Sequence, residues 1–315
     1  MLAGTSHGRL IAAGGANFPQ APPWEGGRKT WYDTIFVLDS PKGTWQTART
    51  RLPRPLGYAV TVTYDNEVIV AGGESPTAEG SEARREVFAI RWTGEDVSLT
   101  PLPPLPSPVM NACGAILGSR LYVAGGASSP TVATKSFWSL DLAADSDQQT
   151  WTVHPTWDGP PRMLAVAAVA NGGFYLLSGA ELSAGPDGKP ARRFLRDAHC
   201  FDPAAGWRKL ADLPRAVVAA PGPAAVINDR IVVFGGDDGE QFQNPLQDHK
   251  GFPSGVLAYD PATNRWSDAS TIPVPRVTVP LVPWGDEWVL ISGEKHPGVR
   301  SPEVWAYSPT TKSRK

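Results

Sequence analysis

GYAVTVTYDNEVIVAGG, residues 57–73, consists of an alternating segment, a tight turn at DNE and an apolar run that ends in a glycine pair. The alternation is typical of a half-buried β-strand, and the apolar run is typical of a strand buried on both faces. The apolar run and its glycine recur at spacings of roughly 53 to 58 residues. The other copies are LIAAGG (10–15), LYVAGG (121–126), YLLSGA (175–180), IVVFGG (231–236) and WVLISGE (288–294). Six β-rich copies at nearly even spacing predict a propeller with six blades.

Each copy extends into a unit of four short strands. After VIVAGG, the segments EVFAIRW and VSLTPLPPLP supply the third and fourth strands. Asp-Pro forms the turn between these strands at Asp202–Pro203 and Asp260–Pro261, as β-turn chemistry favours. A tryptophan opens the fourth strand, where we expect its bulk to fill the space between neighbouring blades. These tryptophans are Trp45, Trp151, Trp207 and Trp266.

The glycine pair, the aromatic-Asp-Pro turn and the tryptophan together resemble the kelch repeat. The resemblance covers the whole chain and implies an all-β, six-bladed kelch-type β-propeller with four antiparallel strands per blade, in one domain over residues 1–315. The last unit has VTVPLVPW, WVLISG and EVWAYSP but no fourth strand with a tryptophan. Because the ends of a closed propeller usually share a blade, we expect the closing blade to lack one strand in this chain. The missing strand would be encoded upstream of Met1.

The composition argues against several kinds of partner. Lysine and arginine number 29 and aspartate and glutamate 31, mixed along the chain, so no nucleic-acid-binding surface is expected. No apolar stretch approaches the ~18–20 residues of a membrane span, and the first residues do not follow the pattern of an export signal. The two cysteines, Cys113 and Cys200, are too few for a disulfide framework or a zinc site, and we expect both to be buried free thiols.

Long loops are expected to gather on one face of the propeller. They connect the second and third strands of each unit, and long loops on a rigid scaffold are where a binding site is expected. A carboxylate or amide follows most of the glycine pairs, at Asn17, Glu74, Glu181, Asp237 and Glu294. The crossings between units add Arg54, Asn111, Arg162, Arg215 and Arg276. Two interpretations stay open: the two sets pair to close the propeller, or they line a cavity for a polar, acidic small molecule.

The most informative local segment is SGEKHPGVRSPEVW, residues 292–305. It places Glu294, Lys295, His296 and Arg300 on one short loop. It resembles the GE-x-x-PG-x-R segment of the N-acetylneuraminate epimerases, also called sialic acid mutarotases. Residues 14–39 resemble the first long loop of that family, and residues 235–261 resemble a cyclically permuted branch of it. The position of the GE-x-x-PG-x-R segment in the final repeat is consistent with this permuted order.

The resemblance implies a cofactor-independent isomerase that interconverts the α and β anomers of N-acetylneuraminic acid, with no metal. By its place in the motif, Glu294 is the expected acid/base, and Arg300 is expected to hold the carboxylate of the acidic sugar. The remaining expected substrate-binding residues are Arg162, Arg276, Asn111, Asn17, His249 and Lys295. Trp24, Glu74, Glu181 and Asp237 are further candidates for the pocket wall. The family often works outside the cytoplasm, which leaves a periplasmic location open.

Three other readings compete with this one. A non-catalytic kelch propeller would bind a protein or carbohydrate and would be expected to expose aromatic anchors on a wide face, whereas these loops are rich in glycine, proline and charge. A sialidase would carry S-x-D-x-G-x-T-W turns, and only DSPKGTW (39–45) partly resembles one. A copper oxidase of the galactose oxidase type needs a cluster of tyrosine and histidine ligands, which the sequence does not display.

Overall fold

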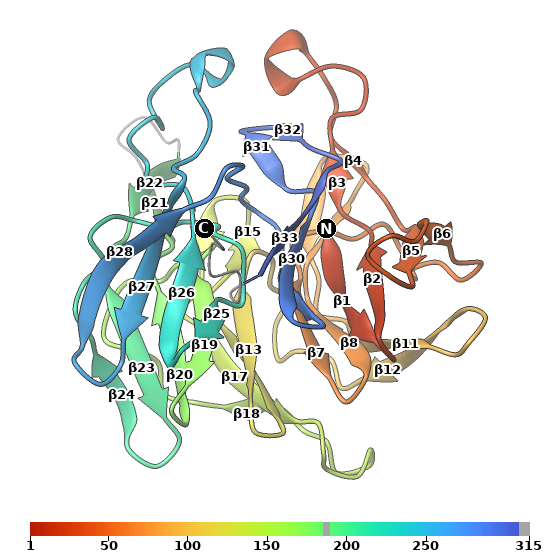
Figure 1. Cartoon of the computed structure of the whole chain (residues 1–315), viewed down its shortest axis with the longest axis horizontal. Helices are drawn as coiled ribbons and strands as arrows, with labels where there is room; N and C mark the ends of the chain where they lie inside the picture. Colours follow the sequence, from red (N-terminus) through yellow and green to blue (C-terminus); the bar gives the residue numbers. More distant parts are fainter. Residues whose placement is uncertain (185–189, 309–315) are drawn as a thin grey trace, which may run out of the picture.

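The computed structural model describes residues 1–184 and 190–308, and in them it shows six antiparallel sheets arranged around a central axis (Figure 1). Five sheets have four strands and the sixth has three within these residues. The first strands of neighbouring blades lie against one another around the axis. The prediction of an all-β, six-bladed propeller is therefore confirmed.

The blades follow the order of the sequence. Blade 1 contains β1 (Leu2–Ser6), β2 (Arg9–Ala13), β5 (Ile35–Leu38) and β6 (Gln46–Thr47). Blade 2 contains β7 (Val60–Tyr64), β8 (Glu67–Ala71), β11 (Val87–Trp92) and β12 (Val97–Leu102). Blade 3 contains β13 (Cys113–Leu117), β14 (Arg120–Ala124), β17 (Phe137–Asp141) and β18 (Thr152–Val153). Blade 4 contains β19 (Val166–Ala170), β20 (Gly173–Leu177), β23 (Ala198–Asp202) and β24 (Gly206–Lys209). Blade 5 contains β25 (Ala225–Ile227), β26 (Arg230–Phe234), β27 (Gly255–Asp260) and β28 (Arg265–Thr271). Blade 6 contains β29 (Leu281–Trp284), β30 (Glu287–Ile291) and β33 (Val304–Tyr307).

The glycine pair joins each blade to the next. In blade 3 the Gly126 N–H donates to the carbonyl of Arg162, 2.8 Å away on the crossing into blade 4. A Cβ on Gly125, whose φ is +64°, would lie 2.4 Å from that same carbonyl oxygen. A side chain would therefore push the crossing away, and only glycine allows this approach without strain. The same bond joins Gly15 to Leu56 and Gly73 to Val109.

The hydrophobic core lies between blades, and one cluster joins blade 6 to blade 1 through Val282, Val289 and Ala12. The tryptophans on the fourth strands reach back to the preceding blade. Trp151 donates its indole N–H to the Pro103 carbonyl at 2.8 Å, and Trp207 donates to Pro155 at 2.9 Å. This arrangement confirms the predicted role of these tryptophans. Cys113 and Cys200 are buried free thiols, as expected.

The long loops rise together on one face, seen at the top of Figure 1. In five blades they form two-stranded ribbons. The ribbons are β3 (Ala16–Asn17) with β4 (Thr30–Trp31), β9 (Glu74–Pro76) with β10 (Ser81–Ala83), β15 (Ala127–Ser129) with β16 (Val132–Ala133), β21 (Ala180–Ala184) with β22 (Pro190–Phe194), and β31 (Glu294–His296) with β32 (Val299–Arg300). Short 3-10 helices η1 (Pro23–Glu25) and η2 (Leu246–Asp248) lie in the loops of blades 1 and 5.

In blade 6, β33 is the outermost strand among the described residues and carries exposed Val304, Trp305 and Tyr307. The sequence analysis found no fourth strand for this blade, and residues 310–315, at the end of the chain, lie outside the described residues. The expectation that the missing strand is encoded upstream of Met1 stays a prediction. Within the described part of the chain, no helix is long and apolar enough to cross a membrane.

Candidate active site

Five residues form a hydrogen-bonded arc around the mouth of the central channel, which we call the collar: Tyr58, Asn111, Leu164, Ala219 and Thr278. Each adopts a left-handed backbone conformation with φ between 54° and 56°. Each N–H from Asn111 onward donates to the carbonyl of the preceding member at 2.8–2.9 Å. The collar thereby connects five neighbouring blade entries and fixes the positions of its side chains relative to one another.

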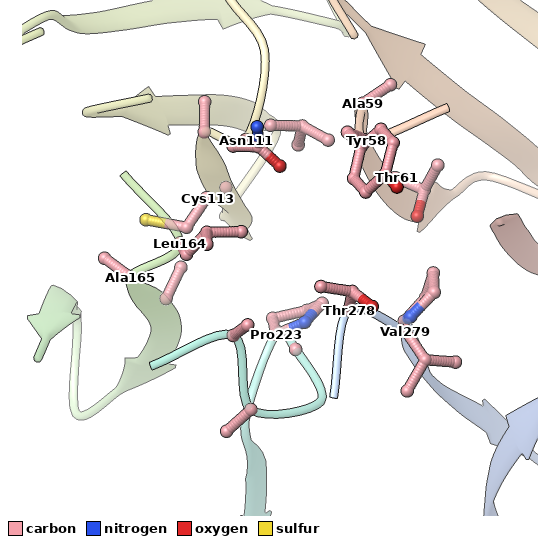
Figure 2. Close-up of a pocket in the computed structure, with 18 of the residues that line it drawn as sticks. Tyr58, Ala59, Thr61, Asn111, Cys113, Leu164, Ala165, Pro223, Thr278 and Val279 are labelled. Atoms are coloured by element: carbon pink, nitrogen blue, oxygen red, sulfur yellow. The ribbon is translucent and has the colours of Figure 1, made fainter. Parts of the chain in front are cut away.

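All five collar residues line a cavity on the channel axis, as the view in Figure 2 shows for Tyr58, Asn111, Leu164 and Thr278. The cavity encloses about 650 Å³ when the solvent at its mouth is included. Its deeper wall is largely apolar, with Ala59, Ala165 and Val279 among the lining residues. A concave site with an apolar wall and a few polar groups at its rim is typical of small-molecule binding.

Glu294 and Arg300 are not among the lining residues, but they meet beside the cavity, in contact with Thr278 and Tyr58 of its wall. They are directly opposed on the β31–β32 ribbon, and the guanidinium Nη2 of Arg300 lies 3.6 Å from Glu294 Oε1. The Gly298 N–H donates to Glu294 Oε1 at 3.2 Å, and the Thr278 hydroxyl donates to Oε2 at 3.3 Å. The side chains of Glu294 and Arg300 are only 17% and 12% exposed, respectively. The ribbon and the collar therefore hold this carboxylate in one orientation.

Arg300 uses most of its donors within the protein. Its Nη1 donates to the hydroxyl of Thr278 and, at 3.4 Å, to the Thr278 carbonyl. Its Nη2 donates to the Tyr58 hydroxyl at 3.1 Å. Arg300 thus spans the two ends of the collar, from blade 6 to blade 2, and places its charge beside Glu294.

Tyr58 lies between two cations. Lys29 Nζ is 4.3 Å from the centre of its ring, and Arg300 lies 5.8 Å from the same ring. Lys29 also contacts the Trp31 ring at 4.6 Å and forms an ion pair with Glu74 at 3.4 Å. The first long loop is therefore tied to the collar through contacts between cations and aromatic rings.

A second pair of charges lies on the side of blades 4 and 5. Asp237 follows the glycine pair of blade 5 at the position that Glu294 occupies in blade 6. Asp237 forms a β-bridge with Val218, and Glu294 forms one with Val277; each of these partners directly precedes a collar residue. Burial raises the pKa of Asp237, while the Gly239 N–H and nearby Arg192 oppose that shift. Burial lowers the pKa of Arg192, and the carboxylates of Asp237 and Glu294 oppose that change.

Loops from distant parts of the sequence meet above the site. A Cβ added to Gly298 would lie 2.6 Å from Pro23. The absence of a side chain at Gly298 therefore lets the ribbon of blade 6 pack directly on the loop of blade 1. The His249 ring lies 5.7 Å from His296 and 5.2 Å from Phe252. His249 Nδ1 accepts the Gly251 N–H at 3.1 Å. His249 is buried, and these contacts order the loop of blade 5.

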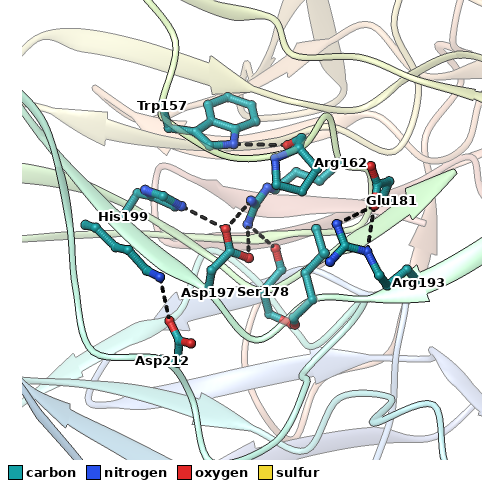
Figure 3. A network of polar contacts seen from close by, with 11 residues as sticks. Trp157, Arg162, Ser178, Glu181, Arg193, Asp197, His199 and Asp212 are labelled. Atoms are coloured by element: carbon teal, nitrogen blue, oxygen red, sulfur yellow. Dashed lines mark hydrogen bonds and ion pairs between the residues drawn. The ribbon is translucent and has the colours of Figure 1, made fainter. Parts of the chain in front are cut away.

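Arg162 and Arg276 do not line the cavity. Arg162 is fully buried, and it donates to Asp197 and to the Ser178 carbonyl in the network of Figure 3. Arg276 is likewise buried and pairs with Glu303 at 2.5 Å. Both lie two residues before a collar residue, where the other crossings place the apolar Leu56 and Val109. Their side chains therefore face the space between blades, where they pair with Asp197 and Glu303 and not with the carboxylates that follow the glycine pairs.

Arg54 and Arg215 also make structural contacts. Arg54 pairs with Glu86, and Arg215 donates to the carbonyls of Gly235 and Gly255. Asn111 is the expected residue that the structure places in the cavity wall. Asn17 accepts a hydrogen bond from Tyr32 at 2.8 Å, one residue beyond the position equivalent to Glu294.

Three further expected residues, like every expected residue except Asn111, are not among the described residues that line the cavity. Glu181, also one residue beyond the position of Glu294, pairs with Arg193, as Figure 3 shows. Lys295 is exposed, because it lies between Glu294 and His296 on a strand and points to the opposite face. Trp24 is half-buried in η1.

The sequence reasoning missed Tyr58, Thr278, Lys29 and Arg192. Tyr58 and Thr278 could have been found by aligning the repeats, because each collar residue follows a crossing at the same place in its unit. Lys29 and Arg192 carry no such signal, since they lie on loops of different length. Within the described residues, no group of three or more His, Cys, Asp or Glu side chains could hold a metal ion.

The family model for N-acetylneuraminate epimerase matches residues 1–99 and 102–254. The chain belongs to the N-acetylneuraminate epimerase family. The matched residues include Lys29, Tyr58, Asn111 and Arg192, while Glu294 and Arg300 lie beyond them.

Similar proteins carry the same family name. An N-acetylneuraminate epimerase of Haemophilus influenzae (strain 86-028NP) is 28% identical over 229 residues, which is 64% of this chain and 58% of that protein. One from Brucella melitensis biotype 1 is 28% identical over 248 residues, covering 69% of this chain and 62% of that protein. The chain therefore spans about three fifths of the length of the curated relatives it matches.

Among solved structures, the one described as "Structure of YjhT" superposes with a TM-score of 0.71 and covers 98% of this chain and 95% of its own. At 15% sequence identity this likeness shows the propeller fold alone.

Proposed function

We propose that this propeller is a mutarotase that interconverts the α and β anomers of N-acetylneuraminic acid. The observation that carries the proposal is that Glu294 and Arg300 lie side by side next to the cavity, held by Thr278 and Tyr58 of the collar. A polar rim above an apolar wall suits a sugar acid with one polar and one less polar face. Membership in the N-acetylneuraminate epimerase family supports the same substrate class.

Mutarotation requires one proton to leave the anomeric hydroxyl and another to reach the ring oxygen. In the proposed reaction, the Glu294 carboxylate accepts the proton of the anomeric hydroxyl as the bond between C2 and the ring oxygen breaks. Glu294, now protonated, gives a proton to the ring oxygen, and C2 becomes a ketone. Rotation about the C2–C3 bond presents the other face of the ketone, and the ring oxygen attacks it while the protons return. The same carboxylate serves as base and as acid, and no electrons are exchanged with another molecule.

Arg300 has two roles in this proposal. Its contacts with Thr278 and Tyr58 hold Glu294 in place, and its charge attracts the carboxylate of the sugar. The gain from such positioning comes from holding the reacting groups at a fixed distance. Tyr58 and Asn111 provide further hydrogen-bonding groups in the cavity wall.

A time course by proton NMR tests the proposal. A sialidase releases α-N-acetylneuraminic acid, and the appearance of the β anomer is followed with the wild-type protein, with Glu294→Gln and with Arg300→Ala. We expect the wild-type protein to accelerate equilibration and Glu294→Gln to lower that rate by about 10²–10⁴-fold, the usual contribution of a general acid–base group. A Glu294→Gln variant that is folded and as fast as the wild-type protein would contradict the assignment of Glu294.

A further inference from the structure

Arg192 occupies the inner face of the blade 4 ribbon. On β22 it lies opposite Leu182 of β21 and shares its face with Phe194, two residues further along. Leu182 and Phe194 pack on the buried cluster beneath the loops, which includes Ala219 of the collar. Arg193 lies on the opposite face of the strand, where it pairs with Glu181 and is 66% exposed. Neighbouring arginines on one strand therefore have different surroundings.

The Arg192 guanidinium has free donors. Within the part of the chain that the structure describes, it makes no hydrogen bond or ion pair, and its contact is with the Phe242 ring at 5.4 Å. The side chain is nevertheless partly buried, and it senses the charges of Asp237 and Glu294. No nitrogen of Arg192 is among the described buried side-chain atoms that lack a hydrogen-bond partner, so water still reaches its free donors. A ligand that supplies acceptors would displace this water and pair with the guanidinium.

Arg300 is less well suited to chelate a carboxylate. Its two terminal nitrogens already donate to Thr278 and Tyr58. Lys29 is engaged by Glu74 and by two aromatic rings. Of these three cationic side chains, Arg192 therefore has the most donors left for a ligand.

We propose that Arg192 binds the carboxylate of the acidic sugar through two parallel N–H···O bonds, from the side of blades 4 and 5. The inference rests on the proposed function for the identity of the sugar and assigns the recognition of its charge to a residue outside the GE-x-x-PG-x-R segment. The guanidinium carbon of Arg192 lies 5.4 Å from the centre of the Phe242 ring, and its N–H groups are available for a planar carboxylate. The sugar then lies between Arg192 and Arg300, with Glu294 beside its anomeric centre.

Binding of two ligands tests this assignment. N-acetylneuraminic acid and its methyl ester differ in charge at the carboxyl group, and isothermal titration calorimetry measures the affinity of each. The variants are Arg192→Met, which removes the charge and keeps much of the length, and Arg193→Met as the matched control from the same strand. We expect Arg192→Met to weaken binding of the acid by about ten- to a hundredfold and binding of the ester by less than about twofold. Arg193→Met should change neither.

Several outcomes would overturn the inference. These are unchanged affinity of Arg192→Met for the acid, equal losses for the acid and the ester, equal losses in both variants, or no binding of the acid by the wild-type protein. The proposed function fails separately: if the acid binds and Arg192→Met abolishes binding, but the wild-type protein does not accelerate anomer exchange, Arg192 remains the carboxylate ligand and the chemistry is wrong.

Discussion

At the scale of single residues, the Thr278 hydroxyl connects the two residues of the GE-x-x-PG-x-R segment that we place in the site, because it donates to Glu294 and accepts from Arg300. Thr278→Val keeps the shape and removes both contacts. Since hydrogen bonds to charged groups contribute about 1.5–3 kcal/mol, we expect the mutarotation rate to fall at least about tenfold with little change in stability. The control is Thr61→Val, at another threonine of the cavity wall. Equal rates for both variants and the wild-type protein would show that Thr278 does not position Glu294.

A second prediction concerns Asp197, the partner of the fully buried Arg162. Burial opposes ionisation of Asp197, but hydrogen bonds from His199 and Arg162 hold its pKa well below the usual range. A carboxyl group with a depressed pKa in the folded state stabilises the protein above its unfolded pKa of about 3.9, and this stability is lost as the pH falls toward the folded value. Asp197→Asn should therefore destabilise the protein by about 3–5 kcal/mol at pH 7 and flatten the dependence of unfolding free energy on pH below about 4. Urea unfolding at several pH values measures the loss of stability and its pH dependence. If the unfolding free energy of Asp197→Asn changes with pH as steeply as that of the wild-type protein, Asp197 is not the carboxyl group responsible.

At the scale of structural elements, the glycine pair is the joint between blades. Gly125→Ala would place a methyl group against the Arg162 carbonyl at a left-handed φ, and we expect a loss of about 2 kcal/mol or more. Gly118 has nearly the same φ, +63°, in a turn with nothing within 4 Å of an added Cβ. Gly118→Ala should cost only the backbone strain of about 1–2 kcal/mol. Urea denaturation compares the two variants. Equal losses of unfolding free energy would mean that backbone strain, and not the contact between blades, explains the glycine at this position.

The elements were predictable from the sequence to the extent that they repeat. The strands of every blade followed from alternation and turn residues, and the tryptophan contacts followed from bulk placed at the same position in each unit. The expected substrate-binding set combined positions with different surroundings, because Arg162 and Arg276 lie two residues before the collar, whereas Asn111 lies in it. The sequence places each crossing between blades from its prolines, and this does not distinguish two positions that are two residues apart. One of these positions places its side chain at the channel, and the other places it between blades.

At the scale of the whole molecule, the site is assembled from loops that are far apart in sequence. Lys29, Tyr58, Arg192 and Glu294 come from four different blades, and the closed ring of interblade cores brings them together. The motif allowed Glu294 and Arg300 to be proposed together because both lie on one short segment. It missed the others because their proximity depends on ring closure, which no local pattern encodes.

The central claim is that this molecule catalyses exchange between the anomers of N-acetylneuraminic acid. Two-dimensional exchange NMR on an equilibrated solution of the sugar measures that exchange directly, without a coupled enzyme. We predict cross-peaks between the H3 protons of the α and β anomers whose intensity grows in proportion to the concentration of the protein and disappears with Glu294→Gln. An exchange rate equal to that of buffer alone, in the presence of folded wild-type protein, would contradict the account.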